Sequence, residues 1–213
     1  MIHAAKENGA EVAKFQLFDA KALFPKKNNP WYRNNLNAEL SREETENLYE
    51  HCTETGIEFM ASAFDEERVG WLEAMGVKRH KLASRSIADN NLITTLEQSQ
   101  KPLLVSLGHW QSENLPEIRS RGGVQFLHCI SEYPTPLEKV NLSSIDFYGP
   151  IKGFSDHTLG ISACLAALSR GATVIEKHFT MDKKMDGPDH LCSITPNELL
   201  QLSRFRNDLR KLL

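Results

Sequence analysis

From residue 57 onward, short apolar segments that end in polar residues recur at intervals of roughly 20 to 27 residues, and one more such segment precedes them at residues 11–16. Most are rich in β-branched, aromatic or other apolar residues, which is typical of buried strands. We expect strands at residues 11–16, 57–62, 79–83, 102–106, 124–129, 151–155 and 174–178. Each gap holds a helical pattern or leaves room for a helix. Repeated βα units at this spacing predict a parallel sheet, either wound on both faces or closed into a barrel.

The absence of a phosphate-binding glycine motif favours the barrel. No G-x-G-x-x-G or Walker sequence follows any predicted strand, although open nucleotide-binding sheets usually carry one. We therefore predict one α/β domain, residues 1–213, with a TIM (β/α)8-type barrel that is incomplete at its N-terminus. Seven strands are one too few, and residues 2–7 resemble a helix end. Because open barrels expose two sheet edges, we expect residues before Met1 or a second chain to cover the gap.

Helical patterns fill most of the gaps between the predicted strands. We expect helices at residues 2–7, 41–55, 66–75, 89–98, 114–121, 159–170 and 195–212. Capping boxes open two of them, Ser41 to Glu44 and Thr195 to Glu198. We expect the last helix to turn these residues inward: Leu199, Leu202, Phe205, Leu209 and Leu212. Residues 17–40 show no periodicity, and such long irregular segments are usually functional or mobile.

The composition indicates an ordinary water-soluble domain. The chain is 40% hydrophobic and 25% charged, with a formal net charge of −3, so neither nucleic acid nor an anionic membrane is an expected partner. Four cysteines without a C-x-x-C pair predict free thiols in a reducing compartment. No apolar run approaches the length of a membrane span, and the first residues lack a signal-peptide core. We expect a cytoplasmic protein.

Two histidines follow neighbouring predicted strands. His157 comes just after the strand at 151–155, and His178 closes the strand at 174–178, with one helix between them. A parallel crossover brings the carboxyl ends of both strands to the same edge, so the imidazoles can converge. Two neutral imidazoles make a good site for a divalent metal. The alternative is that each ring is simply hydrogen-bonded at a strand end, and spacing alone leaves both open.

Other predicted strand ends carry hydroxyl and ammonium groups. Around the rim we find Lys14, Gln16, Ser62, Lys81, Ser84, Ser106, Ser131, residues 155–157 and residues 176–178. Phosphates and carboxylates accept hydrogen bonds only, so such donors suit an anionic phosphorylated substrate, with a metal at the histidines. Any one serine could instead be an ordinary residue of a βα turn. The collective pattern is the more specific signal.

Six segments, in order along the chain, resemble motifs of the N-acetylneuraminate (sialic acid) synthase family. They are Lys14-Phe15-Gln16, residues 81–86 (KLASRS), 129–134 (CISEYP), 153–158 (GFSDHT), 176–180 (EKHFT) and 187–190 (GPDH). The resemblance implies a TIM barrel that joins phosphoenolpyruvate to N-acetylmannosamine or a related amino sugar. It also implies a divalent metal, Mn²⁺ or Mg²⁺.

The resemblance assigns roles to individual residues. His157 and His178 would be the metal ligands and, with Lys14 and Lys81, the catalytic residues. Phosphoenolpyruvate would be held by Lys14, Ser62, Lys81, Ser84, Ser106, Ser131 and Ser155, with Gln16 also in the substrate site. Tyr133 and Asp189 would lie toward the sugar. The family pattern further implies a homodimer, in which an antifreeze-like domain, with no counterpart here after Leu213, reaches the partner's sugar site.

The chain also departs from the family pattern. Arg85-Ser86 stands where the family commonly has Gly-Glu, while Ser62 and Ser131 replace the more usual Thr and Asn. Two other functions therefore stay open. One is a non-catalytic barrel that still binds metal or an anionic sugar. The other is a metal-dependent hydrolase that uses His157, His178 and Asp156 to activate water, with Zn²⁺ expected in place of Mn²⁺.

Overall fold

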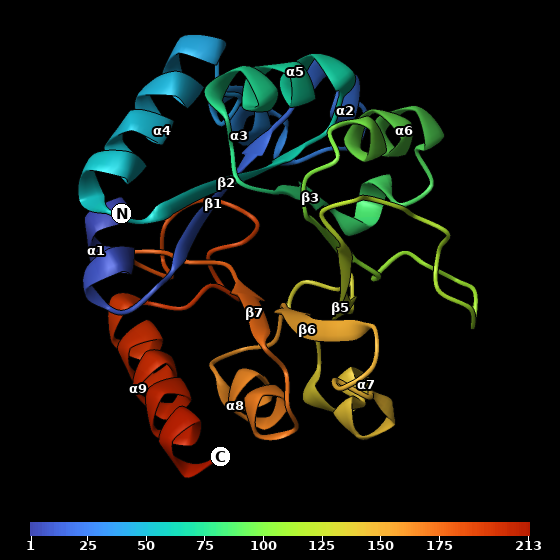
Figure 1. Cartoon of the computed structure of the whole chain (residues 1–213). Coiled ribbons are helices and arrows are strands. Elements are labelled where there is room, and N and C mark those ends of the chain that lie inside the picture. The colour runs from blue at the N-terminus through green and yellow to red at the C-terminus, as the bar shows by residue number, and fades with distance from the viewer.

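The computed structural model describes residues 1–213 and contains one sheet of seven parallel strands, paired in the order of the chain (Figure 1). The strands are β1 (Val12–Leu17), β2 (Glu58–Ala63), β3 (His80–Leu82), β4 (Leu103–Ser106), β5 (Val124–Cys129), β6 (Ile151–Asp156) and β7 (Val174–Lys177). All seven predicted strands are confirmed, with boundaries shifted by a few residues at most. Each strand and its neighbour pair in parallel, as repeated βα units require.

The sheet curls around a central axis, and helices cover its outer surface (Figure 1). These helices are α1 (Ile2–Glu7), α4 (Arg42–Thr55), α5 (Glu66–Met75), α6 (Asn90–Gln98), α7 (Leu137–Val140), α8 (Ser162–Ser169) and α9 (Pro196–Leu212). The first and last strands, β1 and β7, do not pair with each other. The fold is thus an α/β barrel of the TIM type that is open between these two strands, as predicted.

Capping chemistry determines where two of the longer helices begin. Ser41 and Glu44 form the predicted capping box of α4, and Thr195 and Glu198 form that of α9, where Pro196 is the first helical residue. Each box satisfies backbone N–H groups that the first turn would otherwise leave free. Helix α4 ends at Gly56, whose φ of 71° lies in the left-handed region.

The helix predicted at residues 114–121 does not form, and that prediction is wrong. Pro116 disfavours helical geometry for the residue before it and has no N–H to donate. The backbone N–H of Arg119 instead donates to the Glu97 carboxylate of α6 at 2.8 Å. A side chain from a neighbouring helix thus accepts the hydrogen bond of this N–H group, and the segment stays irregular.

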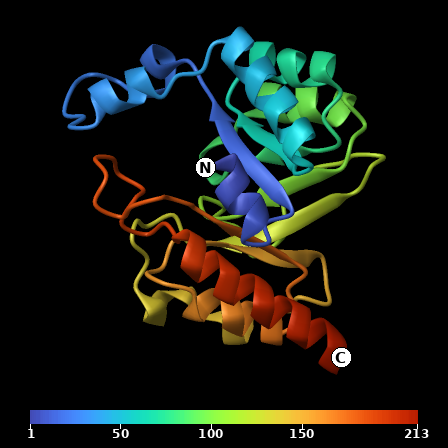
Figure 2. The same ribbon diagram turned by 90° about the vertical axis from the view of Figure 1, so that its left-hand side faces the viewer.

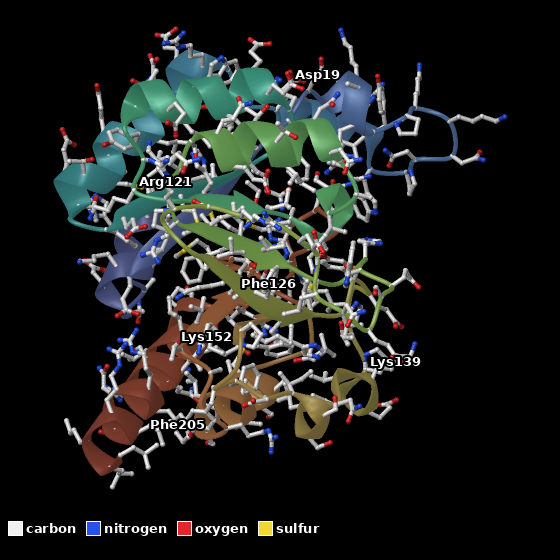
Figure 3. All side chains as sticks on the ribbon, turned by 45° about the vertical axis from the view of Figure 1, so that its right-hand side comes forward. Asp19, Arg121, Phe126, Lys139, Lys152 and Phe205 are labelled. Carbon is white, nitrogen blue, oxygen red and sulfur yellow. The ribbon has the colours of Figure 1, made fainter.

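Two further expectations need correction. Residues 17–40 include two short helices, α2 (Ala20–Leu23) and α3 (Tyr32–Asn37). Leu212 does not face inward, since it is 79% exposed in the last turn of α9. The other four predicted residues of α9, including Phe205 (Figure 3), pack in a cluster with α8. Leu212 follows the pattern but lies beyond the surface that this cluster covers.

The largest hydrophobic core lies between the first half of the sheet and α1, α4, α5 and α6. Leu17, Leu82, Val105 and Leu127 are fully buried in the sheet, and Phe126 on β5 lies near the middle of the molecule (Figure 3). Strands β2 to β4 are buried almost throughout, whereas β1 and β7 are half-buried along most of their length. This difference follows from their position at the edges of the open sheet. None of the helices has the length and apolar character needed to span a bilayer.

Replacing Leu82 with Ala should lower the free energy of unfolding by about 2–5 kcal/mol, because the lost methyl groups leave a cavity in a fully buried position. Replacing Leu212 with Ala is the matched control and should change it by less than about 0.5 kcal/mol. Urea denaturation measures both. Equal losses in the two variants would contradict the assignment of the core.

Candidate active site

The pairing register brings the inward side chains of several strands to the same level. Gln16 pairs with Ser62, and Ser62 pairs with Lys81. On the other half of the sheet, Cys129 pairs with Ser155, and Ser155 pairs with Glu176. Because side chains alternate between the two faces of a strand, these residues point into the barrel together. The parallel register therefore builds a polar interior near the carboxyl end of the sheet.

The carboxylate of Glu176 connects two lysines from the opposite half of the sheet. It lies 3.3 Å from the Lys14 ammonium and 3.6 Å from that of Lys81. Lys81 also donates to the Ser106 hydroxyl at 2.7 Å, and this hydroxyl donates to Glu176 at 3.4 Å. The three charged groups join β1, β3 and β7. Two positive charges against one negative charge leave the network with a net attraction for anions.

Burial and neighbouring charges shift the pKa values of Glu176 and Lys81 in opposite directions. Burial alone would raise the pKa of Glu176, but the ammonium groups of Lys81 and Lys14 hold it well below its ordinary value. Burial lowers the pKa of Lys81, and the Glu176 carboxylate opposes that shift. Glu176 therefore stays ionised at neutral pH. This ionised carboxylate compensates the positive charge of the two ammonium groups, which would otherwise repel each other in the barrel interior.

The two histidines meet at the ends of β6 and β7. The ring centroids of His157 and His178 are 5.4 Å apart, and Tyr133 packs against the first at 4.0 Å and the second at 6.0 Å. The Nδ1 of His157 lies 2.9 Å from the carbonyl of Ile130. A carbonyl only accepts, so Nδ1 carries the proton and Nε2 keeps its lone pair. The Nδ1 of His178 is 3.8 Å from the carboxylate of Asp189.

Both rings have the protonation state that a metal ligand needs. Burial lowers the pKa of His157 below its ordinary value and that of His178 to about 4. Neutral imidazoles with a free Nε2 are good ligands for divalent ions. No group of three or more His, Cys, Asp or Glu side chains in the chain is arranged to hold a metal. The residues present fit an ion with two protein ligands whose other positions would be filled by substrate or water.

A small cradle lies beside His157. The Ser84 hydroxyl accepts from the backbone N–H of Gly108 at 3.0 Å and donates to the Cys129 thiol at 3.4 Å. That sulfur lies 4.0 Å from Nδ1 of His157. A Cβ added to Gly108 would come within 2.4 Å of the Ser131 hydroxyl. It would also come within 2.9 Å of the Ser84 hydroxyl and of the Cys129 sulfur. The cradle exists only because residue 108 lacks a side chain.

Two hydroxyls in this interior have no partner. The Oγ atoms of Ser62 and Ser131 are buried, and neither makes a hydrogen bond. An unpaired buried hydroxyl costs free energy, and most native proteins avoid it. Such groups in a polar interior are suited to a ligand that supplies the missing acceptors.

Two loops extend on the same side of the molecule at this end of the barrel. They contain α2 with α3, and residues 178–195 (Figure 2). The side chain of Asn34 in the first loop donates to the Asp186 carboxylate in the second at 2.9 Å. Ile194 pairs with Phe179, so the second loop folds back along the extension of β7. The loops therefore touch each other across the side on which the sheet is open.

Most residues predicted from the sequence gather at this site. The lysine network contains Lys14, Lys81 and Ser106. The cradle contains Ser84 and Ser131. The imidazole pair is flanked by Tyr133 and Asp189. Ser62, Ser155 and Gln16 occupy inward positions at the same level.

Asp156 is the exception, because its carboxylate is fully buried and accepts from Lys177, Thr158 and Cys164. The hydrolase hypothesis therefore lacks its third residue.

Sequence reasoning assigned no role to Glu176, Cys129 or Gly108. Two of them could have been found, since each stands two residues before an assigned position and so shares its face of the strand: Glu176 before His178 and Cys129 before Ser131. Gly108 had no signal, because its importance comes from three side chains of other segments. Arg85, which departs from the family pattern, is exposed and lies 5.0 Å over the ring of Phe24.

Comparison with known proteins agrees with the fold. A model of the NeuB family matches residues 1–213. The chain is 36% identical over 241 aligned positions to the N,N′-diacetyllegionaminic acid synthase of Legionella pneumophila, an alignment that covers 100% of this chain and 67% of that protein. It is 33% identical to the human N-acetylneuraminate-9-phosphate synthase, with 96% and 63% covered. The chain thus spans about two thirds of the length of these relatives.

A solved structure of a related protein has the same fold. The N-acetylneuraminic acid (sialic acid) synthetase of Leptospira borgpetersenii, crystallised in complex with citrate, superimposes with a TM-score of 0.87 at 29% identity. The superposition covers 100% of this chain and 77% of that one.

Replacing Glu176 with Gln should destabilise the protein at pH 7 by about 2–3 kcal/mol, because two ammonium groups lose their counter-charge. The folded-state pKa of Glu176 lies below the ordinary 4.5, so its contribution is present above that pH and is lost as the pH falls below it. The stability difference between wild type and variant should therefore shrink on acidification. Chemical denaturation over a series of pH values measures it.

Glu46→Gln is the matched control, since Glu46 pairs with Arg42 on the exposed face of α4. This change should lower the free energy of unfolding by less than about 1 kcal/mol. A Glu176→Gln variant as stable as this control would show that the central carboxylate does not hold the network together.

Proposed function

This chain belongs to the NeuB family, and we propose that it is a transferase that condenses phosphoenolpyruvate with an N-acylated amino sugar, N-acetylmannosamine or a relative, to give a nonulosonic (sialic-type) acid and phosphate. The observation that carries the proposal is the neutral imidazole pair beside two lysines and several hydroxyls at one end of the barrel. Relatives named as legionaminic, pseudaminic and N-acetylneuraminate-9-phosphate synthases support it.

The donor network suits the two anionic groups of phosphoenolpyruvate. Lys14 and Lys81 supply positive charge, and Ser62 and Ser131 supply hydroxyls that have no partner within the chain. Charged and neutral donors at fixed positions bind phosphate and carboxylate strongly because they need little reorganisation. C3 of phosphoenolpyruvate bonds to the carbonyl carbon of the sugar and water adds at C2, and the same donors compensate the negative charge that develops when the bond from C2 to the phosphate oxygen breaks. Glu176 keeps the lysines in place before the substrate arrives.

The imidazoles would serve the sugar end of the site. His157 and His178 would hold Mn²⁺ or Mg²⁺ through their Nε2 atoms. When bound, such an ion supplies Lewis-acid chemistry to the carbonyl oxygen of the open-chain sugar. The Ile130 carbonyl orients the His157 ring from its Nδ1 side, and the Asp189 carboxylate lies 3.8 Å from Nδ1 of His178. Tyr133 packs over both rings and would exclude water from that side.

Compartment and assembly form part of the same proposal. All four cysteines are buried and free, which fits a reducing cytoplasmic compartment. A second copy of the chain is the proposed partner, since the exposed edges of β1 and β7 are surfaces that proteins usually cover.

The proposal predicts turnover. Phosphoenolpyruvate, Mn²⁺ and N-acetylmannosamine, or another N-acylated hexosamine, should together release free phosphate and form a nonulosonic acid, detected by a phosphate assay and by mass spectrometry. Lys81→Met should lower kcat/KM by about a hundredfold or more, because a donor to the leaving group is lost. Phosphate release without a sugar, or no turnover with any N-acylated hexosamine, would overturn the proposed reaction.

Binding can be tested separately from turnover. Phosphoenolpyruvate with Mn²⁺ should raise the thermal midpoint, since a ligand at a hundredfold excess over its Kd adds about 2.7 kcal/mol of stability. Thermal protection without turnover in any of the sugars would identify a non-catalytic binding barrel. An unchanged midpoint would contradict both functions.

Gly108→Ala tests the cradle. The new methyl group should occupy the space between Ser84, Cys129 and Ser131, so we expect the thermal protection by phosphoenolpyruvate to fall sharply while the protein remains folded. Gly70→Ala is the matched control, because a Cβ at that position in α5 meets nothing within 4 Å. This control should keep full protection. Equal protection in both variants would show that the ligand does not enter the cradle.

A further inference from the structure

A second buried ion pair lies outside the site described above. The Lys177 ammonium is 2.7 Å from the Asp156 carboxylate, and their side chains are 2% and 0% exposed. Asp156 also accepts from the backbone N–H of Thr158 at 2.8 Å and from the Cys164 thiol of α8 at 3.0 Å. Neither charged residue has a part in the proposed reaction. The pair therefore needs an explanation of its own.

The position of the pair in the sheet is informative. Asp156 and Lys177 are the last residues of β6 and β7, and the register pairs them directly. The next residues along the two strands are His157 and His178. Successive side chains point to opposite faces, so the ion pair lies behind the sheet, against α8, while the imidazoles face the barrel interior. The ion pair thus joins the two strands one residue before each imidazole.

The contacts also fix the backbone on the far side of His157. Lys177 donates to the carbonyl of Thr158 at 2.5 Å, while Asp156 accepts from the N–H of the same residue. The carbonyl of His157 itself accepts from the N–H of Thr135 at 2.9 Å. The carbonyl of His157 and both backbone groups of Thr158 are therefore hydrogen-bonded. The hydrogen bonds of the ion pair run directly from β7 to the turn that carries the first imidazole.

Stability alone is a poor explanation for such a pair. Removing two charges from water is costly, and a well-packed apolar pair often stabilises a protein as well or better. Directional bonds between charged groups do provide what apolar packing lacks, which is a defined geometry. The geometry in question here is the spacing of the two imidazoles.

We propose that Asp156 and Lys177 are positioning residues that set the distance and orientation of His157 and His178, and through them the affinity for the divalent cation of the proposed function. The part that concerns the cation rests on that proposed function, whereas the part that concerns the imidazoles does not.

Three variants separate positioning from stability: Asp156→Asn, Lys177→Met and the double variant. Each single change leaves one charge buried without a partner, so both should lower the thermal midpoint. The double variant removes both charges and should recover much of that stability. Its imidazoles, however, should stay misplaced, because the bonds from Lys177 to residue 156 and to the Thr158 carbonyl are gone. Glu58→Gln is the matched control, since it breaks the Glu58 to Arg79 pair, which joins β2 to the start of β3.

The first readout uses metal-free protein. Nuclear Overhauser contacts between the ring protons of His157, His178 and Tyr133, and the nitrogen shifts that report the His157 tautomer, should match wild type in Glu58→Gln. They should change in the double variant. Wild-type ring contacts and tautomer in a folded double variant would overturn the proposal, whatever its stability.

The second readout is Mn²⁺ alone, measured by the loss of its free electron paramagnetic resonance signal. The double variant should bind Mn²⁺ about tenfold or more weakly than wild type, as is common when groups that orient metal ligands are removed. Glu58→Gln should bind as wild type does. Wild-type affinity in the double variant would count against the proposal. If wild type itself binds no Mn²⁺, the proposed metal fails, and the ring measurements still decide the positioning role.

Discussion

Parallel pairing in register is the constraint on which the rest of the structure depends. Each strand follows the next with little offset, so the carboxyl ends of seven strands lie at one level. Residues separated by more than a hundred positions thereby become neighbours. Lys14 on the first strand reaches Glu176 on the last, although no backbone hydrogen bond joins the two strands. The polar interior is a direct product of this alignment.

Strand β7 has a central role that its length does not suggest. It has four residues and is half-buried at a sheet edge, yet its end carries charge to both faces. Glu176 points inward to two lysines, Lys177 points outward to Asp156, and His178 points inward again. The alternation of side chains in a strand lets one short segment organise the lysine network and the imidazole pair together. Each buried charge of the strand has a partner, which is what makes the arrangement tolerable.

The open side of the barrel is the feature that most separates this chain from a closed eight-stranded barrel. Across it, the contacts are made by side chains and loops. These are the Lys14 to Glu176 ion pair, the Asn34 to Asp186 hydrogen bond, and Arg206 of α9, which donates to Glu11 and to the carbonyl of Gly9. The fold of the Leptospira borgpetersenii synthetase superimposes on the whole of this chain.

The sequence by itself determined the strand order, the barrel class, most helix limits and nearly all the residues of the site. These depend on local patterns, such as capping boxes and polar residues at strand ends, whose physical causes act within a few residues.

Only the tertiary structure decided the rest. In the irregular segment at 114–121 the N–H of Arg119 bonds to Glu97 of another helix, and Leu212 is exposed because nothing packs beyond Leu209. Gly108 matters through three side chains of other segments, and Asp156 leaves the site because Lys177 neutralises it behind the sheet. Such outcomes depend on which distant groups meet, and that is decided by packing in three dimensions.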